Sequence, residues 1–112
     1  MFGFIPGSEV TAETTSLDKL AKAVAMQETH GCKDKTNFTA VNNCHGIRKW
    51  DGKNLVPARY ATKKESYDDF KDIWIRLYGG RDIPTLADAK RYSGDDRAEI
   101  WHRNVLIFLH NG

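Results

Sequence analysis

The sequence predicts an α+β domain that is mainly α-helical and carries one small β-hairpin. Three segments repeat apolar residues with helical spacing, and one strong turn dipeptide separates two short apolar runs. The alternation of strands and helices that is typical of a parallel sheet is missing. Of the 112 residues, 40% are apolar and 29% are charged, which favours one soluble globular domain.

The domain is expected at residues 15–112, after an N-terminal arm at residues 1–14 that has no clear periodicity. Its first helix is predicted at residues 17–30. The buried stripe of this helix has the spacing i, i+3, i+4, i+7, i+8 and comprises Leu17, Leu20, Ala21, Val24 and Ala25. Thr15 or Ser16 is suited to cap its start, and Gly31 is suited to end it.

A polar, irregular segment at residues 31–45 precedes the predicted hairpin. Asp51-Gly52 is the turn dipeptide, with apolar residues on both sides. Pro57 confines the second strand to a sheet edge, because proline has no backbone N–H to donate.

Three more helices are predicted after the hairpin. Thr62-Lys63-Lys64-Glu65 has the pattern of a capping box and opens a helix that ends at Gly79-Gly80. A short helix is expected at residues 85–93. Asp96 is expected to cap the last helix, which has an apolar face up to residue 109.

The charge pattern disfavours several classes of partner. The formal net charge is only +2, and basic and acidic residues alternate along residues 63–76 and 87–103, as on solvated helix faces. A nucleic-acid-binding helical domain would need a basic stripe, so we expect no nucleic-acid partner. No run of 18 apolar residues exists, and residues 1–7 lack the features of a secretory signal. We therefore expect no membrane partner. We expect the protein to be exported by another route or as a domain of a larger exported or phage protein. We also expect it to be a monomer.

Cys32 and Cys44 flank the polar segment and leave three interpretations open. A disulfide would close a short loop, contribute on the order of 3 kcal/mol of stability and fit an extracellular or periplasmic location. Two free thiols are the second interpretation. A zinc site that includes His30 and His45 is the third, but its spacing is unusual and adjacent Cys44 and His45 would strain to bind one ion. We expect no metal and no cofactor.

Glu28 breaks the pattern of the first helix. It follows Leu17 by eleven residues, so it extends the apolar stripe at the C-terminal end of the helix. Partial burial and the negative end of the helix dipole both disfavour the ionised carboxylate and raise its pKa. A general acid that works near neutral pH needs such a shift. The alternative is a solvated glutamate at the rim, paired with Lys22 or Lys33.

Several motifs resemble the lysozyme-like superfamily. Ala25-Met26-Gln27-Glu28-Thr29-His30-Gly31 resembles the helix end at which muramidases, lytic transglycosylases and autolysin-type glucosaminidases place a Glu before Ser or Thr. Asn42-Asn43-Cys44-His45-Gly46-Ile47 is similar to the glucosaminidase element Asn-Asn-Leu-Phe-Gly-Ile-Lys, with Cys44-His45 in place of Leu-Phe and Arg48 in place of Lys. The short β-lobe of the family resembles residues 50–60, its next helix resembles residues 66–70, and its late Tyr-containing turn resembles residues 89–96. The resemblance therefore covers about residues 16–108, with the motifs in the same order.

This resemblance implies a lysozyme-like fold and a glycosidase that cleaves the β-1,4 glycan backbone of peptidoglycan. It implies Glu28 as the general acid and Tyr92 as a hydroxyl close to that acid. Hydrolysis and lytic transglycosylation both remain open, and a non-catalytic cell-wall-binding module is the alternative function.

Substrate contacts are predicted from the residue types that flank the hairpin. Asn43 and His45 are candidates to hydrogen-bond sugar groups, and Trp50 and Tyr60 are candidates to stack on sugar rings. Each of these four residues has an ordinary structural alternative, in a turn or in the core.

A second carboxylate is the missing part of this predicted site. Asp34 and Asp51 are the carboxylates available in the hairpin lobe and the loop before it. Asp34 is more simply explained as a solvated residue, and Asp51 as a residue of its turn.

Overall fold

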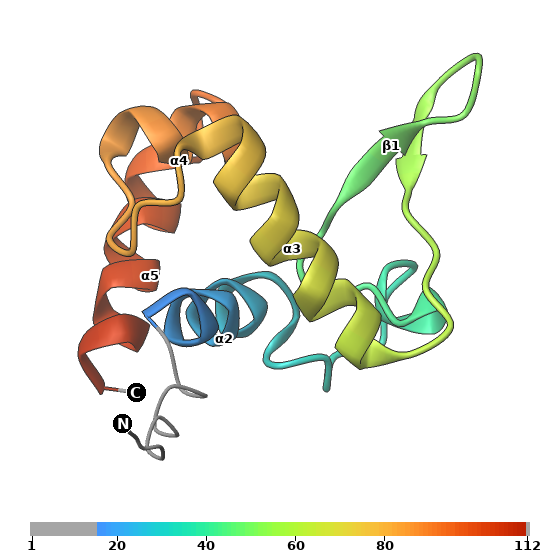
Figure 1. Ribbon diagram of the computed structural model, residues 1–112, viewed down its shortest axis with the longest axis horizontal. Coiled ribbons are helices and arrows are strands. Elements are labelled where there is room, and N and C mark those ends of the chain that lie inside the picture. Colours follow the sequence, from blue (N-terminus) through green and yellow to red (C-terminus); the bar gives the residue numbers. More distant parts are fainter. Residues whose placement is uncertain (1–15, 112) are drawn as a thin grey trace, which may run out of the picture.

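The computed structural model describes residues 16–111, which form four α-helices, a short 3-10 helix and a two-stranded antiparallel hairpin (Figure 1). In chain order the elements are α2 (Ser16–Thr29), η1 (Thr39–Val41), β1 (Arg48–Trp50), β2 (Leu55–Pro57), α3 (Lys63–Tyr78), α4 (Leu86–Ser93) and α5 (Ala98–Asn111). The predicted mainly helical α+β class is therefore confirmed, whereas the arm predicted at residues 1–14 lies outside the described residues.

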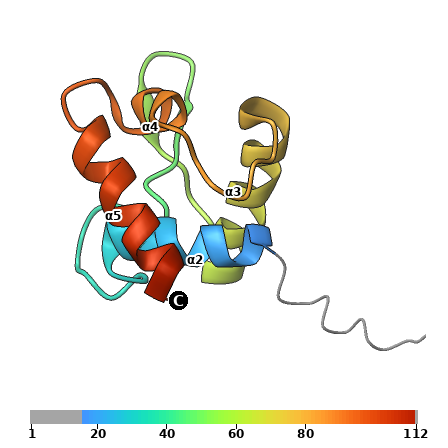
Figure 2. The same ribbon diagram turned by 90° about the vertical axis from the view of Figure 1, so that its left-hand side faces the viewer.

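The helices bury one apolar core. Helix α5 packs beside α2 and α4, and α3 also packs on α2 (Figures 1 and 2). The stripe predicted for the first helix faces this core, where Leu20, Ala21 and Val24 are fully buried. Phe70 and Trp74 of α3 stack on each other beneath them, with ring centroids 5.5 Å apart. These side chains belong to one buried cluster, and their burial stabilises the packing of α2 against α3.

The hairpin projects away from the helices (Figure 1) and pairs Lys49 with Val56 across its two strands. Asp51 accepts hydrogen bonds from the backbone N–H groups of Lys53 and Asn54, both at 2.8 Å, so it serves the turn as predicted. Lys49 binds Asp69 of α3 at 2.8 Å, which ties the hairpin to the helical part.

Two predicted helix caps differ in detail from the structure. Thr62 caps α3 by accepting the N–H of Glu65 at 3.2 Å, but the Glu65 carboxylate accepts the N–H of Ala61 instead of the Thr62 N–H that a capping box requires. Helix α5 begins at Ala98, two residues after the Asp96 predicted to cap it.

A disulfide joins Cys32, just beyond α2, to Cys44, which follows η1. Because the two sulfur atoms are bonded to each other, neither is available to a zinc ion or as a free thiol. Disulfides are typical of proteins that fold in oxidising compartments. Within residues 16–111, moreover, no helix has the length and apolarity that crossing a bilayer requires.

Removing this disulfide should destabilise the protein. A Cys32→Ala/Cys44→Ala variant is expected to lose about 3 kcal/mol of unfolding free energy, since the unfolded chain gains the freedom that the closed loop denies it. Urea denaturation of the variant, beside oxidised and reduced wild type, measures this loss. The prediction fails if all three proteins unfold at the same urea concentration.

Candidate active site

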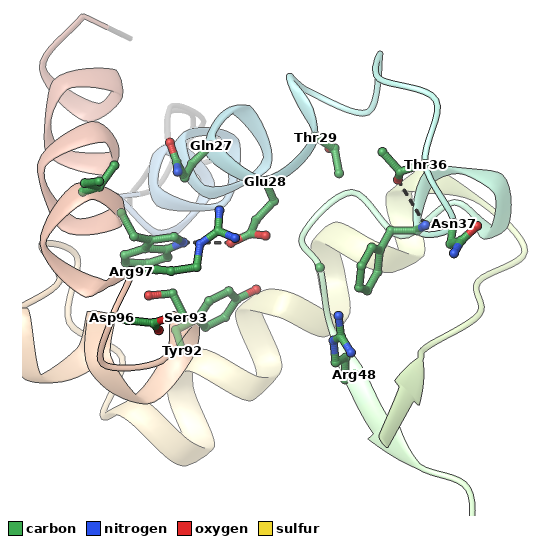
Figure 3. A pocket seen from close by; sticks show the side chains of 14 residues that line it. Gln27, Glu28, Thr29, Thr36, Asn37, Arg48, Tyr92, Ser93, Asp96 and Arg97 are labelled. Carbon is green, nitrogen blue, oxygen red and sulfur yellow. Dashed lines mark hydrogen bonds between the residues drawn. The ribbon is translucent and has the colours of Figure 1, made fainter. Parts of the chain in front are cut away.

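A cavity of about 790 Å³ lies between the helical part and the hairpin (Figure 3). Its walls come from the ends of α2 and α4, the start of α5, the loop before η1 and the first residues of the hairpin. Most of the lining side chains are polar or charged. We call it the Glu28 cavity, because that carboxyl group is the half-buried acid in its wall (Figure 3).

Both oxygen atoms of Glu28 have defined surroundings. The indole N–H of Trp101 donates a hydrogen bond of 2.8 Å to Glu28 Oε2. On the other side, Oε1 lies against Gly46, so closely that a Cβ atom on Gly46 would be only 2.7 Å from it. The carboxyl group is therefore held between the start of α5 and the turn before the hairpin.

Burial raises the pKa of Glu28 above its ordinary value of 4.5. The hydrogen bond from Trp101 and the positive charges of Arg97 and Arg48 lower it, but they offset only part of the effect of burial. Glu28 therefore keeps its proton to a higher pH than an exposed glutamate does, as a general acid must.

Tyr92 lines the same cavity, so the structure brings the two predicted catalytic residues together (Figure 3). Its hydroxyl donates a hydrogen bond of 2.6 Å to the carbonyl oxygen of His45. Burial, and next the charge of Glu28, raise the pKa of Tyr92 well above its ordinary value. The phenol thus stays protonated at neutral pH and serves as a hydrogen-bond donor, not as a base.

Asn43 and His45, which were predicted to bind sugar groups, do not line the Glu28 cavity. The Asn43 amide donates to the carbonyl oxygens of Ile47 and Ala58, at 2.7 and 2.9 Å. His45 Nε2 donates to the carbonyl of Ala21 at 2.9 Å. Both side chains are fully buried and bind the protein itself, so they position the turn that contains Gly46.

Thr29 completes the support of that turn. Its hydroxyl donates a hydrogen bond of 2.8 Å to the carbonyl oxygen of Cys44 and accepts the N–H of Cys32 at 2.9 Å. The residue after the acid thus fastens the end of α2 to the Cys44–Gly46 turn, on the same two segments that the disulfide joins.

Neither aromatic residue predicted to stack on sugars lines the Glu28 cavity. Tyr60 is half-buried, and its hydroxyl donates to Asp69 Oδ2 at 2.5 Å. Trp50 is 66% exposed near the hairpin turn. Alternate residues of a strand share a face, so Trp50 lies on the face of Arg48, a cavity residue, while Lys49 faces Asp69 on the other side. Trp50 therefore lies on the same face of β1 as Arg48, nearer to the hairpin turn.

Neither carboxylate suggested as a partner for Glu28 lines the Glu28 cavity. Asp34 pairs with His30 at 3.1 Å, and Asp51 is occupied by its turn. Among the described residues, Asp96 is the other carboxylate that lines the cavity (Figure 3). Sequence reasoning assigned Asp96 to a helix cap. The available signal was its place in the late Tyr-containing turn, four residues after Tyr92.

His45 gives this site a measurable pH dependence of stability. Burial lowers the pKa of His45 from 6.5 to about 4, because the cationic form is poorly solvated there. As the pH falls, His45 takes up a proton in the unfolded chain before it does so in the folded protein. Its effect on the free energy of unfolding is therefore absent above about pH 6.5, and stability is lost as the pH falls towards 4. At about pH 5 the expected loss is about 2 kcal/mol.

This loss is measured by urea denaturation at neutral pH and at about pH 5. The Glu28→Gln background suits the measurement, because the raised pKa of Glu28 would stabilise the fold as the pH falls and mask the effect. His45→Gln added to it should remove the loss, whereas His30→Gln, at an exposed site, should retain it. An equal loss in the His45→Gln variant would refute the assignment.

Comparison of the chain with models of protein families, with curated proteins and with solved structures finds no match. The resemblance of its motifs to lysozyme-like enzymes therefore stays a prediction.

Proposed function

We propose that this protein cleaves the glycan backbone of peptidoglycan, with Glu28 as the general acid. The observation that carries the proposal is the setting of this one carboxyl group. It lies in the wall of a large polar cavity, it is partly desolvated, and a neutral indole N–H holds one of its oxygens. Glycosidic cleavage needs such an acid to protonate the leaving oxygen.

The hydrogen bond from Trp101 supports the assignment of the acidic proton to one particular oxygen of Glu28. Oε2 accepts the indole N–H, so we place the acidic proton on Oε1, the oxygen next to Gly46. Transfer of this proton to the glycosidic oxygen lets the C–O bond break, and the electron pair leaves with the departing sugar. The remaining sugar develops positive charge at its ring, which a nearby carboxylate stabilises.

Asp96 is the candidate for that second carboxylate, because it lines the same cavity (Figure 3). It is exposed and so remains accessible to water that would complete a hydrolysis. If Asp96 does not take part, the ionised Glu28 that remains after proton transfer can itself remove a proton from the sugar hydroxyl that closes the anhydro ring. The first route yields a reducing end and the second an anhydro sugar.

The proposal is tested by the loss of turbidity of purified peptidoglycan with the wild-type protein. Clearing by wild type and none by Glu28→Gln is the result expected. Binding to peptidoglycan without clearing, equally by both proteins, would instead favour the non-catalytic cell-wall-binding module.

Trp50 should contribute to binding of the polymer without contributing to the chemistry. Trp50→Ala is expected to raise KM for polymeric peptidoglycan about fivefold, since an aromatic ring stacked on a sugar contributes on the order of 1 kcal/mol. Its kcat should stay near the wild-type value, because the residue does not line the cavity. Ile75→Ala removes a similarly exposed apolar side chain on α3 and should leave KM unchanged. Equal KM values for the two variants would exclude this role of Trp50.

A further inference from the structure

Two arginines, Arg48 and Arg97, line the Glu28 cavity, and neither has an ion-pair partner among the described residues. The arginines of residues 16–111 that do form ion pairs are Arg76, with Asp72, and Arg81, with Asp88. None of the ion pairs found within residues 16–111 includes Arg48 or Arg97. Arg97 lies on the same side of the cavity as α5, and Arg48 lies on the hairpin side (Figure 3).

Arg48 is held in place by an aromatic ring. Its guanidinium lies 5.2 Å from the centroid of the Phe38 ring, which also lines the cavity. The backbone on both sides is fixed, because Arg48 pairs with Pro57 in the hairpin and the Phe38 carbonyl accepts the N–H of Asn43 at 2.9 Å. A guanidinium that lies over an aromatic ring can keep N–H groups available to bind a carboxylate.

The positive charge of Arg48 acts against the proposed acid. It lowers the pKa of Glu28 and so works against the proton that the acid needs. With Glu28 protonated, the charged side chains lining the cavity are two arginines and Asp96, which leaves an excess of one positive charge. An anionic group bound at Arg48 would remove this excess and would leave the acid better able to keep its proton.

We propose that Arg48, supported by Phe38, binds a carboxylate carried by the glycan, so that the cavity selects acidic over neutral glycans. This inference rests on the proposed function and names the class of its substrate. Peptidoglycan fits it, since alternate sugars carry a lactyl group that ends in a carboxyl or in an acidic peptide. The subsite lies next to the acid, within the range at which the charge of Arg48 acts on Glu28.

The test compares two forms of one soluble peptidoglycan fragment, with its carboxylates free or converted to methylamides. Calorimetric titration into the Glu28→Gln variant measures binding without cleavage. We expect the free acid to bind about tenfold more tightly than the amide, because a charge-assisted hydrogen bond is lost on amidation. Adding Arg48→Gln should abolish this preference, and Arg48→Lys should restore part of it.

Arg59→Gln is the matched control, because it removes the same charge at an exposed position outside the Glu28 cavity. It should leave the preference intact. The inference is overturned if the two fragments bind equally, if Arg59→Gln and Arg48→Gln weaken the preference alike, or if Arg97→Gln abolishes it and Arg48→Gln does not. Any of these results leaves the proposed cleavage standing. If neither fragment binds and wild type does not clear peptidoglycan, both the inference about Arg48 and the proposed cleavage are overturned.

Discussion

Replacing Glu28 by glutamine is expected to lower kcat for peptidoglycan cleavage by about a thousandfold, the scale that positioned proton transfer contributes. Glutamine has nearly the same shape, and its amide oxygen can still accept the indole N–H of Trp101. It has no acidic proton to give to the leaving oxygen. The variant should therefore keep the geometry of the site and lose its cleavage activity. Turbidity and product-release assays measure this activity.

The matched control is Glu99→Gln, which removes a carboxylate from an exposed position in the first turn of α5. Its activity should equal that of wild type. Peptidoglycan binding by Glu28→Gln should be close to that of wild type. The Tm of the variant should not be lower than that of wild type, because a desolvated acid is replaced by a neutral amide. Cleavage by Glu28→Gln at more than about a tenth of the wild-type rate would remove Glu28 from the role of acid.

Replacing Gly46 by alanine is the second substitution with a large expected effect. Its Cβ atom would lie 2.7 Å from Glu28 Oε1 and 3.2 Å from Cδ, so the carboxyl group must turn away. That movement breaks the hydrogen bond with Trp101 and displaces the proton from the glycosidic oxygen. Because small misplacements of catalytic groups have large effects, we expect cleavage to fall by about a hundredfold.

Gly52→Ala separates this effect from backbone strain. Gly46 and Gly52 both have positive φ angles, +69° and +106°, so alanine costs about 1 kcal/mol or more of stability at either site. Nothing lies within 4 Å of a Cβ atom at Gly52, so that variant should lose stability without losing activity. If the two variants retain the same activity per folded molecule, the close approach of Gly46 to the acid is not required for catalysis.

The sequence predicts well those features that depend on neighbouring residues. The apolar stripe of α2 follows from helical spacing, and the same spacing places Glu28 at the end of the buried face. The hairpin turn follows from Asp51-Gly52, since Asp51 binds backbone groups only two and three residues away. Local periodicity and turn chemistry are sufficient for such elements.

Other features of the site depend on contacts between distant segments. Helical spacing places Trp101 on the apolar face of the last helix, and only the packed structure shows that its N–H donates to a carboxylate 73 residues earlier in the chain. Asn43 and His45 are residue types that often bind ligands, and only the packed structure shows that the protein itself satisfies their polar atoms. The place of Asp96 in the cavity wall likewise follows from where α5 begins, which a capping pattern did not fix.

Cleavage of the glycan by Glu28 is tested by mass analysis of the products released from purified peptidoglycan. We expect soluble disaccharide–peptide fragments with intact peptides and newly formed sugar ends, either reducing or anhydro. These fragments should come from wild type and not from Glu28→Gln. Release of no fragments, or release of peptides cut at amide bonds from an intact glycan, would contradict cleavage of the glycan by Glu28.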